Sequence, residues 1–263
     1  MKDIKLFFQN IKKYYKYAIR SAKAELKSEV SDSYLNWLWW IIEPLCFMLI
    51  YAFIFGYVFK AREPYFAAFI IIGLTAWDFF SRMLKGSVKL IINNRDLVTK
   101  VYIPKYILLL SKSFTYLFKM FISLAIAFLL MIITNVPLTL NILYIIPILI
   151  ILYIICFGFG LIIMHFGVFL DDLSNLINIF LRMLLYFSGV FYNISTRLSG
   201  EISYYLLRMN PIAFFINELR KVMIYGINPS FEGLFFWFII GSILCILGIK
   251  IIHKNENSYA KVI

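Results

Sequence analysis

The sequence predicts an all-α, polytopic membrane protein with about six transmembrane helices, an amphipathic N-terminal helix and re-entrant helices before the last span. Of its 263 residues, 62% are hydrophobic and only 15% are charged. With a mean hydropathy of +0.85, the chain lies outside the usual balance of soluble domains. Apolar runs of about 20 residues, the length of a helix that crosses roughly 30 Å of hydrocarbon, recur between Trp37 and Ile252. The bilayer core is therefore the main solvent of this chain.

Residues 1–32 are predicted to form a cytoplasmic amphipathic helix at the membrane interface. One helical face is apolar, with Ile4, Phe7, Phe8, Ile11, Tyr14, Tyr15, Ala18, Ala22 and Leu26. The opposite face is basic, with Lys5, Lys12, Lys13, Lys16, Arg20, Lys23 and Lys27. Such a helix is expected to lie in the headgroup plane, with its apolar face down and its lysines near anionic phosphates. An ordinary solvated amphipathic helix is the alternative. The charged N-terminal residues lack the pattern of a removable signal peptide.

Residues 33–263 are predicted to form one transmembrane domain. By the length and apolar character of its runs, its spans are expected at about 37–59, 65–84, 107–133, 142–170, 173–192 and 234–252. The first span opens with Trp37, Trp39 and Trp40, and tryptophan is enriched at membrane interfaces. Pro44 is expected to kink this helix.

The distribution of Lys and Arg places both termini on the cytoplasmic side. Eight basic residues precede the first span, and six more lie in or beside the connection between the second and third spans: Arg82, Lys85, Lys89, Arg95, Lys100 and Lys105. Cytoplasmic flanks are enriched in Lys and Arg, and an even number of spans returns the C-terminal tail to the same side. Because the basic residues cluster beside apolar spans, the net charge of +12 is assigned to anionic lipid headgroups and not to nucleic acid.

Residues 193–233 are external in this topology, yet their charges nearly cancel. The segment contains four basic and three acidic residues. They are Arg197, Arg208, Arg220 and Lys221, and Glu201, Glu218 and Glu232. Apolar positions between Ile212 and Met223 have helical spacing, so short amphipathic helices are expected to dip into the membrane from outside. Such a backbone is tolerated only where protein or a water-filled cavity surrounds it. The segment is therefore expected to lie at a pathway.

Residues suited to catalysis or metal binding are scarce. His165 and His253 are the only histidines, and they give no basis for an HExxH site or a Ser, His, Asp triad. The adjacent Asp171 and Asp172 point to different faces of a helix, which favours a helix N-terminus over a metal site. No GxxxxGK[ST] motif occurs. We predict no catalytic residue, metal site or cofactor in this chain, and expect any ATP hydrolysis in a partner.

Four ionisable residues fall within predicted spans: Glu43, Asp78, Lys119 and Arg182. Each costs roughly 2.5 to 3.5 kcal/mol near the bilayer centre. With the helical rise along each span, Lys119 and Arg182 come out near mid-depth. Two interpretations stay open. Both cations face a pathway and meet a phosphate-containing substrate, or they pair with Asp78 or Glu43 inside the bundle.

Three segments share features with one family. Residues 33–56, SYLNWLWWIIEPLCFMLIYAFIFG, have a tryptophan, a later proline and a closing Phe-Gly. Residues 93–105, NNRDLVTKVYIPK, form a basic connection closed by Pro104. Residues 210–226, NPIAFFINELRKVMIYG, carry Asn210, Pro211, Glu218, Arg220 and Gly226. Together with the amphipathic N-terminal helix, these features resemble the ABC-2 type permeases that export O-antigen, capsule or teichoic acid.

This resemblance implies a homodimer with two nucleotide-binding ATPase subunits, which bind ATP and Mg²⁺, in the bacterial cytoplasmic membrane. The substrate is then a lipid-linked polysaccharide. In such a protein the 93–105 segment contacts the ATPase through Asn93, Arg95, Asp96, Lys100 and Pro104, and the 210–226 segment lines the outer end of a channel. Further candidates for the channel are Trp77, Lys119, Arg182 and Tyr192. The alternatives are an ABC-2 exporter of drugs or small lipids and an integral-membrane enzyme that acts on lipid carriers.

Overall fold

The computed structural model describes residues 2–31, 33–60 and 63–262, and within these ranges it contains helices and no strand. The longest helices are α1 (Lys2–Ser31), α3 (Phe66–Val88), α6 (Lys105–Ile133), α7 (Ile145–Phe169) and α12 (Phe231–Lys254). The shorter ones are η1 (Asn36–Leu38), α2 (Trp39–Tyr51), η2 (Ala52–Val58), α4 (Leu90–Asn93), α5 (Arg95–Lys100), η3 (Leu140–Tyr144), α8 (Leu173–Phe187), α9 (Ile194–Arg197), α10 (Gly200–Met209), α11 (Pro211–Met223) and α13 (Glu256–Val262). The predicted all-α class is confirmed.

Five helical segments of the described chain are long and apolar enough to cross a bilayer. They are Asn36–Val58, Phe66–Val88, Lys105–Ile133, Leu140–Phe169 and Phe231–Lys254. Each corresponds to one predicted span, and the boundaries differ by a few residues.

The remaining predicted span, 173–192, is shorter in the structure. It corresponds to α8, which ends at Phe187. At 15 residues its length is about 22 Å, against a hydrocarbon core of roughly 30 Å. The chain turns at Gly189, whose φ of 69° lies in the left-handed region that favours glycine. The helix therefore ends before the apolar run ends.

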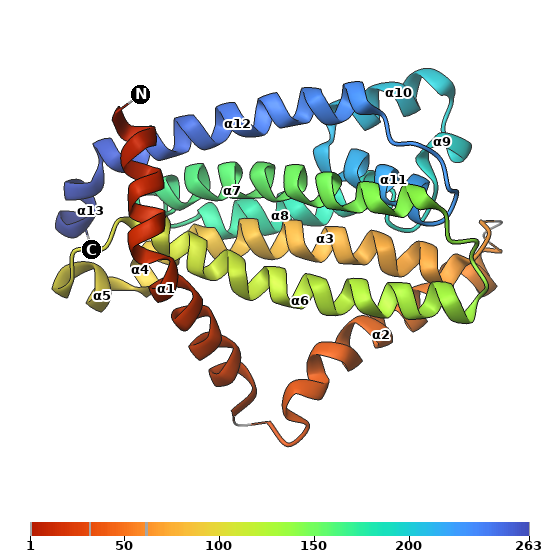
Figure 1. Ribbon diagram of the computed structural model, residues 1–263, viewed down its shortest axis with the longest axis horizontal. Helices are drawn as coiled ribbons and strands as arrows, with labels where there is room; N and C mark the ends of the chain where they lie inside the picture. The colour runs from red at the N-terminus through yellow and green to blue at the C-terminus, as the bar shows by residue number, and fades with distance from the viewer. Residues whose placement is uncertain (1, 32, 61–62, 263) are drawn as a thin grey trace.

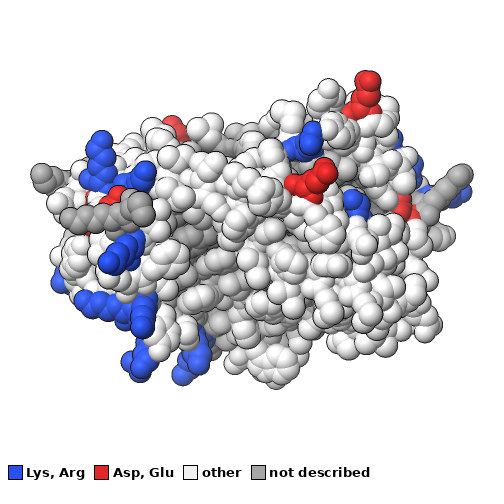
Figure 2. All heavy atoms as spheres, turned by 45° about the horizontal axis from the view of Figure 1, so that its top comes forward, with Lys and Arg blue, Asp and Glu red and all other residues white. Residues whose placement is uncertain are grey.

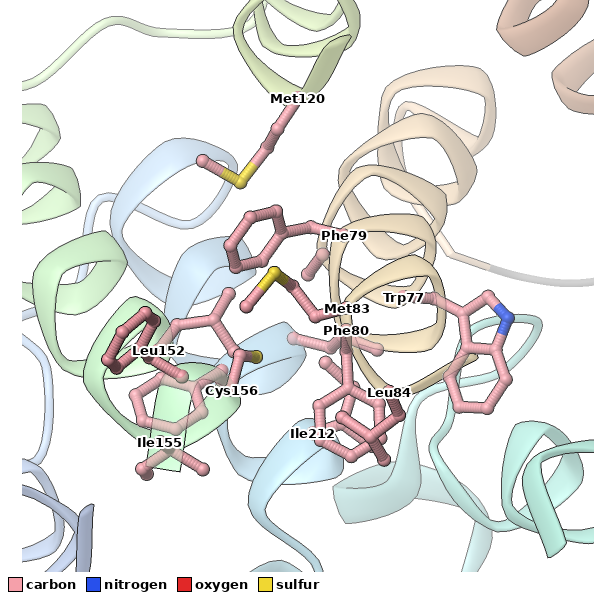
Figure 3. Close-up of a cluster of buried hydrophobic side chains, with 14 of the residues drawn as sticks. Trp77, Phe79, Phe80, Met83, Leu84, Met120, Leu152, Ile155, Cys156 and Ile212 are labelled. Atoms are coloured by element: carbon pink, nitrogen blue, oxygen red, sulfur yellow. The ribbon is translucent and has the colours of Figure 1, made fainter. Parts of the chain in front are cut away.

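The centre of the molecule is α3. In Figure 1, α3, α6, α7 and α12 run side by side with nearly parallel axes. Figure 3 shows Phe79 and Met83 of α3 among Met120 of α6 and Leu152 and Cys156 of α7. Most side chains of α3 are buried inside the chain, so this span contacts other helices on nearly all sides.

Glycines set the contact between α7 and α12. Gly158 on α7 lies against Leu244, and on α12 Gly241 lies against Ile155 and Gly248 against Leu161. A Cβ atom at any of the three would be 2.6 to 2.8 Å from its neighbour. Small residues allow helices in a membrane to approach closely, so α7 and α12 pack as one unit along their length.

The amphipathic helix α1 does not lie on lipid with its whole apolar face. Its Phe7, Ala18 and Ala22 are buried within the protein. Ser111 of α6 donates a hydrogen bond to the carbonyl oxygen of Ala18 at 3.1 Å, a close approach that the small alanine side chain permits. The helix is thus present as predicted, but the centre of its apolar stripe packs along α6, whereas Phe8 and Tyr15 stay exposed.

The two ends of the bundle carry different elements. The start of α1, the short helices α4 and α5, and α13 lie at one end, and α9, α10 and α11 lie at the other (Figure 1). On the face shown in Figure 2, Lys and Arg gather at the first end, charges of both signs occur at the second, and the band between them is almost uncharged. Such a band is expected of a surface that contacts hydrocarbon.

Candidate functional site

The 93–105 segment projects from the end of the bundle that carries α4 and α5. Its Asn93, Arg95, Asp96 and Lys100 are exposed, whereas Pro104 is buried. Lys100 Nζ lies 3.8 Å from Asp96 Oδ1, and an exposed pair of this kind contributes little to stability. These charges are therefore available to a partner.

Apolar side chains divide the same segment into an anchor and an exposed surface. Val98 and Ile103 are buried and hold the segment against the bundle. Val101 and Tyr102 are 50% and 71% exposed beside the charged residues. Exposed aromatic side chains and arginine are enriched in protein interfaces. The surface that α5 and the following residues present therefore has the chemistry of a protein contact.

Two of the four ionisable residues of the spans, Glu43 and Lys119, form ion pairs inside the chain, but not the pairs considered from the sequence. Glu43 of α2 pairs with Arg82 of α3 at 2.9 Å. Lys119 of α6 pairs with Glu29 of α1 at 2.6 Å, and not with Asp78 or Glu43. This partner was not expected from the sequence, because the first helix was predicted to face lipid headgroups.

A second pair lies about two turns nearer the start of α6. Lys112 pairs with Glu25 of α1, and the Thr115 hydroxyl donates to the same carboxylate at 3.3 Å. Glu25 and Glu29 are four residues apart, so both lie on the face of α1 that also carries Ala18 and Ala22. That spacing was the available signal for this contact.

A cavity of about 20 Å³ lies between α2, α3 and α6. It is lined by Trp40, Glu43, Pro44, Thr75, Asp78, Phe79, Arg82, Tyr116, Lys119, Met120 and Ser123. A volume of this size holds about one water molecule. Asp78 lines this cavity together with Glu43 and Arg82 of one ion pair and Lys119 of another.

The four channel candidates do not converge within one chain. Trp77 is buried on α3, and Figure 3 shows it pointing away from Phe79 and Met120. Lys119 is paired with α1, Arg182 is exposed on α8, and the Tyr192 hydroxyl donates to the carbonyl oxygen of Tyr186 at 2.8 Å. In the described residues, no hydrogen bond or ion pair joins any two of the four candidates.

Arg220 of α11 connects three parts of the chain and is only 4% exposed. Its guanidinium donates to the carbonyl oxygen of Phe69 in α3 at 3.0 and 3.1 Å. It also donates to the carbonyl oxygens of Gly189 at 2.6 Å and Val190 at 2.7 Å, directly after α8. Helix α11 packs against α3 and α7, and its start shares a cavity with Phe80 and Leu84 of α3, so it lies beside these spans instead of over the end of the bundle.

The space for this guanidinium is provided by Gly73. A Cβ atom there would lie 2.5 Å from Arg220 Nη2. The guanidinium also lies 3.3 Å from the centre of the Phe69 ring, a cation–π contact. In a desolvated site, a cation that meets carbonyl oxygens and an aromatic face is stabilised without a carboxylate.

The other residues of the 210–226 segment hold α11 in place. Asn210 accepts a hydrogen bond from the backbone N–H of Ala213 as the N-cap, and Pro211 occupies the first helical turn. Glu218 is 1% exposed and accepts from the backbone N–H of Ser230 and from Lys221 Nζ, both at 2.7 Å. The segment is therefore fastened to the start of α12.

Gly226 ends this segment in a conformation that few other residues adopt. Its φ is 63°, and a Cβ atom would lie 2.8 Å from the side chain of Thr139. Asn141 Nδ2 donates to its carbonyl oxygen at 2.5 Å. All five residues noted in this segment therefore have a structural role at the end opposite to α4 and α5.

Comparison with known proteins covers nearly the whole chain. A family model described as ABC-2 type transporter matches residues 19–224. A Klebsiella pneumoniae protein named O-antigen export system permease protein RfbA is 25% identical over 240 residues, which are 91% of this chain and 92% of that protein. A Myxococcus xanthus protein of the same name is 24% identical over 256 residues, which are 96% of this chain and 98% of that protein.

The family match begins within α1 and ends just after α11, so it includes both the 93–105 segment and most of the 210–226 segment. The resemblance seen in the sequence is thereby confirmed. Transporters of this family work with an ATPase partner. The chain belongs to the ABC-2 type transporter family and is a multi-pass membrane subunit for transport, not an enzyme.

Proposed function

We propose that this chain is the membrane subunit of an ATP-driven exporter that moves a lipid-linked polysaccharide across the bacterial cytoplasmic membrane. The polysaccharide is of the O-antigen, capsule or teichoic acid type. The observation that carries the proposal is the similarity, over 91% to 96% of the chain, to two proteins named as O-antigen export permeases. The exposed 93–105 segment adds a surface through which a separate ATPase acts.

In this proposal the chain crosses the membrane six times, with both termini in the cytoplasm. The five long spans are joined by α8 as a shorter sixth crossing. The basic end of the molecule, which carries α4, α5 and α13, is then cytoplasmic, in agreement with the enrichment of Lys and Arg on that side. Helices α9 to α11 then lie at the external end of the molecule.

The working unit is proposed to be a homodimer with two nucleotide-binding subunits, which bind ATP and Mg²⁺. The exposure of Arg182 supports the proposed homodimer. This residue is exposed on α8 beside the exposed Ile179 and Met183, and a charged side chain facing lipid at this depth costs several kcal/mol. A second copy or a water-filled path removes that cost. The channel is thus expected along this face of α8.

The basic face of α1 is proposed to bind anionic lipid headgroups. Asp3 lies 3.5 Å from His253, and Glu25 and Glu29 pair with lysines of α6. The acidic residues of this helix are therefore turned inward. The outward face keeps seven exposed cations, Lys5, Lys12, Lys13, Lys16, Arg20, Lys23 and Lys27, and each is worth about 1 kcal/mol near an anionic leaflet.

Removing two charges from the 93–105 segment tests whether the ATPase acts through this segment. In the double variant Arg95→Ala/Asp96→Ala, we expect export to fall roughly tenfold or more, the scale of a coupling free energy between two sites. ATP hydrolysis by the partner then continues without transport. Export of labelled glycan into inverted vesicles and ATPase activity are measured at equal expression.

The matched control removes the same two charge types at the opposite end. Glu201 and Arg208 are both exposed on α10, so Glu201→Ala/Arg208→Ala tests for a general effect of charge loss. Wild-type export by the Arg95/Asp96 variant, at wild-type expression, contradicts the docking role of the 93–105 segment.

A further inference from the structure

A buried lysine closes the 93–105 segment. Lys105 follows Pro104 as the first residue of α6, and its side chain is 5% exposed. In the described chain, the carboxylate within 4.0 Å of its ammonium is that of Glu256 on α13, at 3.7 Å. A buried charge needs a partner of opposite sign. The segment therefore depends on α13 for its charge balance.

Glu256 contacts the same segment at a second point. Its Oε2 accepts a hydrogen bond from the Tyr102 hydroxyl at 3.4 Å, and this carboxylate raises the pKa of Tyr102. Its Oε1 is buried and accepts no hydrogen bond from the described residues. An unsatisfied buried acceptor carries a cost that a closer lysine removes. The pair therefore has room to tighten when the segment moves.

Helix α13 is fixed to the bundle independently of this pair. The chain turns at Asn255 after α12, and α13 lies against the end of α7. Tyr259 is fully buried, its hydroxyl lies 2.8 Å from His165 Nδ1, and its ring packs on Phe169. Glu256 is therefore part of a helix, α13, that contacts α7 through Tyr259 and directly follows α12 in the chain.

We propose that Glu256 is a positioning residue for energy coupling, which passes movement of the 93–105 segment to α7 and α12; this rests on the proposed function. A displacement of Lys105 moves Glu256, and α13 transfers it to the close-packed pair of helices. Helix α12 begins at the opposite end, where Glu218 binds the backbone N–H of Ser230. A contiguous set of contacts thus joins the two ends of the molecule.

The test changes both charges, because a single substitution leaves one buried charge unpaired and can prevent folding. Lys105→Met/Glu256→Gln removes the pair with little expected loss of stability. Lys105→Glu/Glu256→Lys restores it in reverse. The control is Asn257→Ala, an exposed position on the same helix. Export, ATPase activity and thermal unfolding are measured on the complex with its ATPase.

We expect the neutral pair to unfold at the wild-type temperature and to export roughly five- to tenfold more slowly, within the range of one coupling interaction. ATP hydrolysis continues, and the reversed pair regains most of the export. Equal export by the neutral pair and Asn257→Ala overturns the proposal. So does a reversed pair that folds but exports no better than the neutral pair.

A second readout does not require the glycan. In the complex, ATP is expected to change amide hydrogen exchange in residues 250–260 of wild type but not of the neutral pair. The same change in both proteins overturns the role of Glu256. Failure of the wild-type complex to export glycan counts instead against the proposed function, and the exchange measurement still decides the role of Glu256.

Discussion

Arg220 shows how one side chain can position a whole segment. Its donors reach backbone carbonyl oxygens of α3 and of the turn after α8. The resemblance to the family singled out this arginine from the sequence. Its partners could not be predicted, because every residue carries a carbonyl oxygen and only the fold decides which ones remain free.

Replacing Arg220 is expected to destabilise the protein. Lysine keeps the charge but lacks the planar fork, so Arg220→Lys leaves buried carbonyl oxygens unpaired. We expect a loss of about 3 kcal/mol in the free energy of unfolding. Thermal unfolding in detergent measures it, with Arg208→Lys on the exposed surface of α10 as the control. Equal unfolding temperatures for the two variants contradict the role given to Arg220.

Gly73→Ala tests the same site without changing the arginine. The added methyl group displaces Arg220 Nη2, which lies 2.5 Å from the position of the new atom. We expect the unfolding temperature to fall, whereas Gly200→Ala, with open space around it, leaves it unchanged. In the double variant Gly73→Ala/Arg220→Lys, the loss of stability should be smaller than the sum of the two single losses, because both changes break the same contact. Full additivity argues against a shared cause.

At the scale of elements, α1 was predicted as a helix but its contact with α6 was not. An amphipathic stripe fits a lipid surface and a neighbouring helix equally well, so its periodicity cannot choose between them. Packing on α6 is favoured by Glu25 and Glu29, which form ion pairs with Lys112 and Lys119 of α6. Each pair is partly buried and closes a contact that the small Ala18 permits.

Removing these carboxylates is expected to loosen α1. In Glu25→Gln/Glu29→Gln, a loss of about 1.4 kcal/mol raises the population of the undocked helix roughly tenfold. Trypsin reports it, because α1 is rich in exposed lysine and cleavage follows the open population when opening is fast. The control is Glu201→Gln on α10. An unchanged cleavage rate shows that these pairs do not hold α1.

The end of α8 shows a different limit of prediction. The sequence stays largely apolar and uncharged from Phe187 through Tyr192, so a span to residue 192 was expected. The helix ends at Phe187 because Gly189 turns the chain and Arg220 binds the carbonyl oxygens of Gly189 and Val190. A contact from a distant helix decides this boundary.

For the whole molecule, the long spans could be predicted because bilayer thickness fixes their length. A basic connection closed by Pro104 was likewise expected at residues 93–105, and the structure forms the short helix α5 within it. The residues expected to line the channel have separate partners in one chain, since Lys119 pairs with Glu29 whereas Tyr192 donates to the carbonyl oxygen of Tyr186. If two copies form the path, its lining depends on an interface that a single chain does not contain.

The proposed function of this chain is export of a lipid-linked polysaccharide. Its most direct test depletes this protein in the organism that carries it and follows lipid-linked glycan on both sides of the membrane. We expect the lipid-linked glycan to accumulate on the cytoplasmic side while glycan at the cell surface is lost. Normal display of surface glycan after depletion, with no accumulation inside, contradicts the claim.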